Sequence, residues 1–173
     1  MTSIIKVNNI QNTSGSFSAT TTDLTNAPAF QARISGNVTN GASDGSVRKV
    51  EFNSEEFDTD NAYDNSTNYR FTPQVAGKYY VFAKITVDTG GSNMQSMSGH
   101  LFKNDSEFTN TLINFDAGNG EGGSLIMHTI IDLNGSSDYV DARIGVNTVN
   151  DADCNILGDN NQTYFGAYKL IGI

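Results

Sequence analysis

Residues 79–87 read Tyr-Tyr-Val-Phe-Ala-Lys-Ile-Thr-Val, and this run decides the fold class. Every second side chain from Tyr79 to Val87 is apolar, which is the period of two of a β-strand that buries one face. The opposite face carries two large aromatic side chains, Tyr80 and Phe82. Burying a large aromatic side chain is worth roughly 1.5–3 kcal/mol, so two of them on an open sheet face would be costly. The run therefore predicts a strand with one face in a core and the other in an interface.

Shorter runs with the same period continue the pattern outward in both directions. Strands are predicted at 30–35, 49–53, 68–72, 95–103, 111–115, 124–133, 140–147 and 163–173. No stretch sustains a period of 3.6 residues, so essentially no helix is expected. Residue pairs that tolerate positive φ predict tight turns at Asn40-Gly41, Gly90-Gly91, Asn104-Asp105, Asn134-Gly135 and Gly158-Asp159. Many short strands without helical crossovers indicate an all-β fold, an antiparallel jelly-roll β-sandwich.

The composition limits the classes of partner. The 173 residues carry 10 Lys and Arg against 19 Asp and Glu, a net charge of −9. Nucleic-acid binding needs clustered basic side chains, and an anionic membrane surface repels an acidic chain, so neither partner is expected. No window approaches the roughly 20 apolar residues of a spanning helix, and no signal peptide is visible. A single cysteine, Cys154, excludes an intramolecular disulfide framework.

The first 26 residues differ in composition from the rest. Residues 13–26 are mostly Ser, Thr and Gly and cannot bury a core alone, whereas residues 3–10 have the apolar content of one strand. We predict an extended N-terminal arm over residues 1–26 and one head domain over residues 27–173, with a frayed terminus as the alternative. A lone short strand is not stable, so the arm is expected to join a neighbouring sheet or the arms of sister chains. The residues expected to anchor it are Ile4, Ile5, Val7 and Ile10.

Short motifs follow one another in a set order along the body of the chain. They are Ala29-Phe30-Gln31-Ala32, Val50-Glu51-Phe52-Asn53, Tyr63-Asp64, Phe-Thr-Pro-Gln-Val-Ala-Gly-Lys-Tyr-Tyr-Val-Phe at 71–82, Leu101-Phe102-Lys103-Asn104 and Phe165-Gly166-Ala167-Tyr168. In this order they resemble the globular head of complement component 1q and the related tumour necrosis factor (TNF) superfamily, over residues 29–171. Two departures from that pattern are Pro73, one position early, and Ala167, where Gly is usual.

This resemblance implies an antiparallel jelly roll that packs as a homotrimer around a threefold axis. The residues expected at the trimer interface are Tyr80, Phe82, His128 and Tyr168. No Gly-x-y repeat is present, so the collagen stalk of the animal complement family is absent from this sequence and complement function is not carried over.

The opening of the chain has a different resemblance. Ser3-Ile4-Ile5-Lys6-Val7-Asn8-Asn9-Ile10-Gln11-Asn12 resembles the start of fibre-like structural proteins of marine bacteriophages, cyanophages among them. This implies a virion protein that is synthesised in the host cytoplasm and joined to other virion proteins through its arm. Three functions stay open: a tail-fibre-type head whose loops attach to a host-surface glycan or protein, a trimeric capsid decoration, cement or connector protein without receptor binding, and a secreted TNF-like ligand.

Catalysis is not expected from the sequence. The two histidines, His100 and His128, stand in no serine-nucleophile or zinc-protease motif, and His128 is expected to be a packed or interface side chain. Cys154 follows Asp151 and Asp153, whose charges raise a thiol pKa. It is therefore predicted to be a small buried residue and not a nucleophile.

Three closely spaced acidic residues form the motif with the most metal-binding character. Asp58, Asp60 and Asp64 supply carboxylates, and the Asn residues between and after them supply amide oxygens. Ca²⁺ takes six to eight such oxygen ligands, although the spacing is not that of an EF-hand. A calcium site and a solvated acidic loop both stay open, and no other cofactor is expected.

Overall fold

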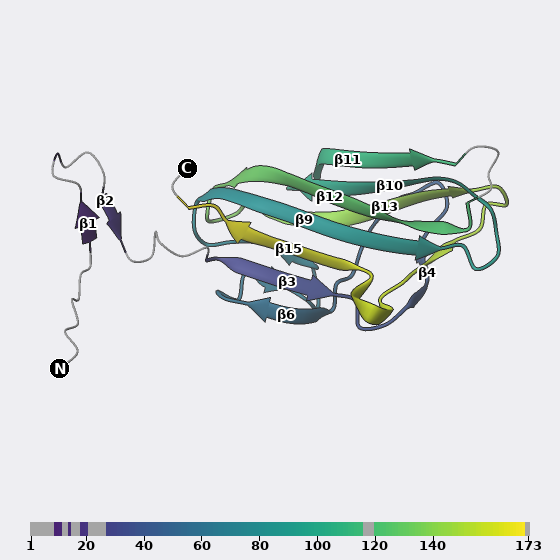
Figure 1. Cartoon of the computed structure of the whole chain (residues 1–173), viewed down its shortest axis with the longest axis horizontal. Helices are drawn as coiled ribbons and strands as arrows, with labels where there is room; N and C mark the ends of the chain where they lie inside the picture. The colour runs from purple at the N-terminus through teal and green to yellow at the C-terminus, as the bar shows by residue number, and fades with distance from the viewer. Residues whose placement is uncertain (1–8, 12–13, 15–17, 21–26, 116–119, 172–173) are drawn as a thin grey trace.

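Two antiparallel sheets packed face to face form the body of the protein (Figure 1). The computed structural model describes residues 9–11, 14, 18–20, 27–115 and 120–171. The first sheet contains β3 (Ala29–Arg33), β4 (Val38–Ala42), β6 (Ser54–Asp58), β9 (Gly77–Asp88), β12 (Gly122–Leu133), β14 (Cys154–Ile156) and β15 (Tyr164–Lys169). The second contains β5 (Val47–Lys49), β7 (Tyr63–Asp64), β8 (Arg70–Phe71), β10 (Met94–Lys103), β11 (Ser106–Asn114) and β13 (Val140–Thr148).

The strand order is that of a jelly roll, as the sequence predicts. The first sheet runs β4-β14-β9-β15-β3-β6, and β12 pairs with the other edge of β9 along its whole length. The second runs β11-β10-β13-β8-β7, with β5 paired to β13. Among the described residues the helical structure is one short 3-10 turn, η3 (Asp159–Asn161), and no helix there is able to cross a membrane.

Strand β9 supplies the centre of the core, and its predicted face is confirmed. The alternate side chains Tyr79, Val81, Ala83, Ile85 and Val87 are all buried between the sheets. The strand lies between β12 on one edge and β14 and β15 on the other. Its inward face is therefore covered by the second sheet, while its outward face belongs to the surface of the first sheet.

Four aromatic residues from four separate motifs converge beside β9. The Phe30 ring lies 4.6 Å from the Phe71 ring and 5.0 Å from the Phe165 ring, and Phe52 lies 5.5 Å from Phe165. Tyr63 completes the cluster by stacking on Phe30 at 4.5 Å. Such ring pairs contribute roughly 0.5–1.5 kcal/mol each beyond the area they bury. The cluster joins β3, β7, β8 and β15 across the two sheets.

Two predicted strands are largely unpaired in the structure. Residues 50–53 lie between β5 and β6, where the Phe52 N–H donates to the Val50 carbonyl at 3.2 Å and interrupts the ladder. Both side chains are still buried. The Val50 N–H still donates to the Ala142 carbonyl on β13 at 3.0 Å, so the burial alternates past the point where the β5–β13 ladder ends. At 68–72 only β8 is paired, because Tyr69 has a φ of +49° and turns the chain immediately before it.

The turn predicted at Asn104-Asp105 is confirmed, and there two consecutive residues have positive φ. Asn104 and Asp105 have φ of +52° and +60° and form the type I′ turn between β10 and β11. The turn predicted at Asn40-Gly41 is wrong, because both residues lie inside β4, where Asn40 has a φ of +53°. Strands β4, β6 and β14 were not expected, and β15 ends at Lys169, earlier than the predicted 173.

The described part of the arm forms a small sheet of its own. β1 (Asn9–Gln11) pairs with β2 (Ser18–Thr20), so Ile10 lies in a strand, and the partner strand was not expected. Ile4, Ile5 and Val7 lie outside the described residues. The chain enters the sandwich at Ala27, where the Lys169 N–H near the C-terminus donates to the Pro28 carbonyl at 3.2 Å. We call this end of the sandwich, where the chain enters it, the arm end (Figure 1).

Candidate functional site

Aromatic and aliphatic side chains cover the outer face of the first sheet. Tyr80 and Phe82 on β9 point outward, between the buried residues of that strand. On β12, His128 lies opposite Phe82 and Ile130 lies opposite Tyr80, while Tyr168 on β15 lies opposite Tyr80 from the other side. We call the whole set the aromatic face: Tyr80, Phe82, Ile126, His128, Ile130, Tyr164 and Tyr168.

The rings of the aromatic face contact one another across three strands. The Tyr80 ring lies 5.8 Å from the His128 ring and 5.4 Å from the Tyr168 ring. The Phe82 ring crosses β15 at Gly166, where a Cβ atom would collide with the ring and lie 2.9 Å from the Phe30 carbonyl oxygen. Glycine at this position therefore lets the ring lie close against the sheet.

The aromatic face has no partner in the described chain. Ile126 and Ile130 are 64% and 51% exposed, and a hollow of about 300 Å³ opens between Phe82, His128 and Tyr164. The structure brings together the four residues that the sequence predicted for an interface, Tyr80, Phe82, His128 and Tyr168. Ile126, Ile130 and Tyr164 were missed. In the run at 124–133 apolar residues occupy both alternating sets, so the sequence did not reveal which set faces outward.

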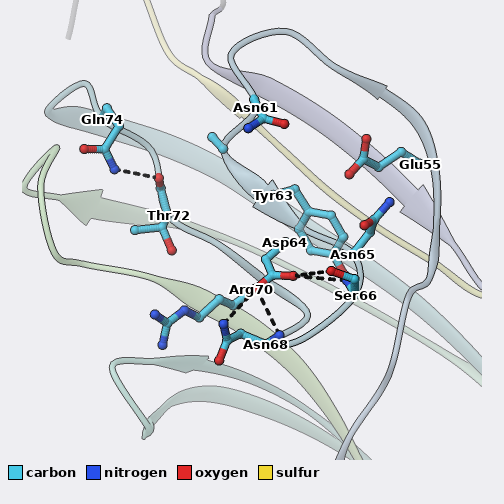
Figure 2. Close-up of a pocket in the computed structure, with 11 residues that line it drawn as sticks. Glu55, Asn61, Tyr63, Asp64, Asn65, Ser66, Asn68, Arg70, Thr72 and Gln74 are labelled. Carbon is cyan, nitrogen blue, oxygen red and sulfur yellow. Dashed lines mark hydrogen bonds between the residues drawn. The ribbon is translucent and has the colours of Figure 1, made fainter.

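A polar cleft of about 500 Å³ lies at the arm end of the sandwich (Figure 2). Its walls come from β6, β7 and β8 and from the loops that join them. The cleft is at this end because the turn after β6 lies beside the start of β3. There the Thr59 N–H donates to the Ala29 carbonyl at 3.0 Å. The polar side chains that line it are Glu55, Asn61, Asp64, Asn65, Ser66, Asn68, Arg70, Thr72 and Gln74.

Asp64 organises one wall of the cleft as a turn. Its Oδ1 accepts hydrogen bonds from the N–H groups of Ser66 and Thr67, at 3.1 and 2.9 Å. Its Oδ2 accepts from the N–H and the side-chain amide of Asn68, at 3.1 and 2.7 Å. The Thr67 hydrogen bond and the others hold the pKa of Asp64 well below its usual range, against the opposing effect of burial.

Arg70, the partner of Asp64 across the β7–β8 pair, is held beside the Asp64 turn by a stacked tyrosine (Figure 2). Its guanidinium carbon lies 4.1 Å from the centre of the Tyr139 ring. The Tyr139 hydroxyl in turn donates to Asp105 at 2.7 Å, and its backbone N–H donates to Asn104 at 2.9 Å. A neutral ring thus holds the arginine in place, and none of the described carboxylates forms an ion pair with it.

The calcium ligands suggested by the sequence are not brought together. The two Asp58 carboxylate oxygens accept from the N–H groups of Asp60 and Tyr63, at 3.2 and 2.7 Å. Asp64 is occupied by the turn described above. Among the described residues no three His, Cys, Asp or Glu side chains are grouped as metal ligands. Asp and Asn side chains at this spacing also cap backbone turns, as Asp58 and Asp64 do here.

His100 lies in a hydrogen-bonded relay that sequence reasoning missed. Its Nε2 lies 2.9 Å from Ser98 Oγ, and its Nδ1 lies 2.6 Å from Glu107 Oε2. A nucleophile, a base and an orienting acid have this order in serine hydrolases. However, β10 is paired on both edges around Ser98, so the nearby backbone N–H groups donate within the sheet and offer no oxyanion hole. The arrangement is therefore a polar packing network.

Cys154 is buried, as the sequence predicted. Burial, and then the charges of Asp44 and Asp153, raise the pKa of its thiol to about 11. A thiol of this kind stays protonated at neutral pH and is a poor nucleophile.

Comparison with known proteins reveals a likeness of fold. No protein-family model matches the sequence, and no curated protein matches it. The structure of Eiger TNF from S. frugiperda is similar with a TM-score of 0.61 at 13% identity, covering 84% of this chain and 93% of that one. Murine APRIL is similar with a TM-score of 0.59 at 10% identity, covering 82% and 98%. The TNF-like jelly roll expected from the motifs is confirmed.

The turn capped by Asp64 is open to a pH test. Asp64→Ala is expected to lower the free energy of unfolding by about 1–3 kcal/mol at pH 7, because several N–H groups lose a charged acceptor. The folded pKa is below the unfolded value of about 3.9, so this stabilisation is complete above that value and disappears as pH falls through the folded pKa. Urea unfolding at pH 7 and pH 3 measures it. Asp60→Ala, an exposed carboxylate, is the control and should change stability by less than about 0.5 kcal/mol.

The relay around His100 is open to a chemical test. A fluorophosphonate probe, which labels activated serines, should leave the folded protein unlabelled because Ser98 has no oxyanion hole beside it. Intact-protein mass spectrometry measures the added mass, with a known serine hydrolase as positive control. Labelling that disappears in Ser98→Ala would overturn the packing interpretation.

Proposed function

We propose that the protein is a non-enzymatic, homotrimeric TNF-like head, and the aromatic face is the observation that carries this proposal. Large apolar side chains are costly to leave in water, at roughly 25 cal/mol per Å² of apolar surface. Monomeric proteins rarely expose contiguous apolar patches of this kind. A threefold assembly covers the aromatic face on every protomer at once.

A threefold ring also needs a second, different patch, because its contacts are head-to-tail. Strand β11 offers one at the edge of the second sheet. Leu112 and Phe108 on that strand are 55% and 47% exposed, although both are large apolar residues. The two patches belong to different sheets, so each protomer has a donor and a receiver surface for its neighbours.

The proposed setting of this trimer is a virion. The support comes from residues 3–12, which resemble the opening of bacteriophage fibre proteins. In this setting the arm of residues 1–26 joins other virion proteins, and the head presents loops to a host-surface glycan or protein as a tail-fibre-type tip. A capsid decoration, cement or connector role without receptor binding is the alternative. The net charge of −9 disfavours nucleic acid and membrane insertion in each case.

A secreted TNF-like ligand is the second candidate function. The observation that favours it is the likeness of fold to Eiger TNF and to APRIL. Both candidates use the same trimer, and they differ in what the arm and the loops contact.

The trimer is tested by sedimentation. The wild-type chain should sediment at three times its mass of 18.6 kDa at micromolar concentration. Ile130→Asp places a charge within the aromatic face, beside Tyr80, and should give a folded monomer, because a desolvated unpaired charge costs several kcal/mol. The matched control is Val149→Asp, which changes another exposed aliphatic residue (48% exposed) outside both patches and should stay trimeric. A wild-type protein that sediments as a stable, folded monomer would refute the proposal.

The role of the arm is tested by truncation. A chain that begins at Ala27 should fold and trimerise, since the aromatic face is intact, but it should fail to join virions. Incorporation is measured by immunoblotting of purified particles, and electron microscopy of labelled full-length protein locates it on tail or capsid. If the truncated chain joins virions normally, the anchor lies in the head.

A further inference from the structure

The geometry of the polar cleft points to a binding site for a neutral saccharide, and we propose this as an activity separate from assembly. None of the residues that line the cleft belongs to the aromatic face. The volume of about 500 Å³ is within the range of roughly 300–1,000 Å³ typical of small-molecule sites. The cleft is open to solvent in a single chain and needs no residue from a second copy.

The walls of the cleft are held in place before any ligand arrives. Tyr63, between them, stacks on Phe30 and donates its hydroxyl hydrogen bond to the Phe52 carbonyl at 3.1 Å. The Thr72 N–H donates to the Ala62 carbonyl at 2.7 Å, which ties the two sides of the loop together. With the Asp64 turn and the Arg70–Tyr139 stack, these contacts hold the backbone of the walls in place. A preorganised site loses less entropy on binding.

Five polar side chains that line the cleft make no hydrogen bond or ion pair within the described chain, although one of them, Arg70, stacks on Tyr139. Asp64, Ser66 and Asn68 are used by their own turn (Figure 2). The unused groups are the carboxylate of Glu55, the amides of Asn61 and Asn65, the guanidinium of Arg70 and the hydroxyl of Thr72. In the described part of the molecule no hydrogen bond or ion pair engages any of the five, so their donors and acceptors are free for a ligand.

This mixture of groups selects the class of ligand. Amides and hydroxyls offer donors and acceptors side by side, and a sugar hydroxyl is itself both donor and acceptor. The carboxylates of Glu55 and Asp64 and the net charge of −9 oppose an acidic ligand. A purely apolar ligand would leave the polar groups unpaired. A neutral saccharide satisfies all of them, and three clefts in one trimer would strengthen binding to a polymer through avidity.

The test uses free neutral sugars and the full-length protein. Glucose, galactose, mannose and their neutral oligosaccharides are titrated while protein NMR shifts are followed, with alginate oligosaccharide as the acidic comparison. We expect saturable shifts with at least one neutral sugar, centred on residues 55–74. The variant Asn61→Gly with Asn65→Ala should weaken this binding at least tenfold. Glycine is chosen at Asn61 because its φ of +53° would strain an alanine.

Two controls separate this inference from the proposed assembly. Asn150→Ala removes an exposed amide outside the cleft and should leave binding unchanged. The monomeric variant Ile130→Asp should bind free sugar as the wild type does, so a failure of the trimer would not hide the site. The inference is overturned if no neutral sugar binds, if the double variant binds as tightly as wild type, or if alginate binds more tightly than the neutral sugars.

Discussion

Strand β9 has apolar side chains on both of its faces, and the rest of the structure depends on how each face is covered. The inward face, from Tyr79 to Val87, is buried beneath the second sheet. The outward face carries Tyr80 and Phe82, and β12 and β15 extend it on both sides with isoleucine and tyrosine. Within the described residues, only the inward face is covered. In the assembly that we propose, another chain covers the second face, and the fold of the protomer is thereby linked to its assembly.

Much of this was predictable because β-strand burial has a period of two. The long runs at β9 and β13 were found, and so were the positions of Phe30, Phe52, Phe71 and Phe165, which come together in one aromatic cluster. Strands β4 and β6 were missed because they lie at the sheet margin and have few buried side chains to mark them. Strand β14 lies inside the sheet and buries Cys154 and Ile156, but three residues are too few to reveal a period of two. At Val50 and Phe52 a strand was predicted because burial alternates. There the Phe52 N–H donates to the Val50 carbonyl and interrupts the strand.

The aromatic face could be predicted from the sequence better than the polar cleft, because the period of two applies to strands and not to loops. Tyr80, Phe82, His128 and Tyr168 share a face because strand geometry puts alternate residues on one side. No comparable sequence pattern predicts the partner of an acidic side chain, because its carboxylate oxygens can bind a metal ion or accept hydrogen bonds from a backbone turn. Asp58 and Asp64 accept from nearby N–H groups, and among the described residues they are not grouped with a third acidic ligand. The contact of His100 with Glu107 required knowing the β10–β11 pairing in advance.

The two surfaces make opposite demands on solvent, and the sandwich separates them. The aromatic face gains free energy by losing water, so it suits a permanent contact between copies. The cleft gains from groups that exchange water for other hydroxyls, so it suits a reversible contact with a polar ligand. The first lies on the pleated face of a sheet, where every second residue is constrained by its neighbours across the ladders. The second lies on loops between short strands, where Asp64 and the Arg70–Tyr139 stack hold the backbone locally. Residues in the cleft therefore have room to vary without disturbing the contacts of the aromatic face, because loops tolerate changes that a packed sheet does not.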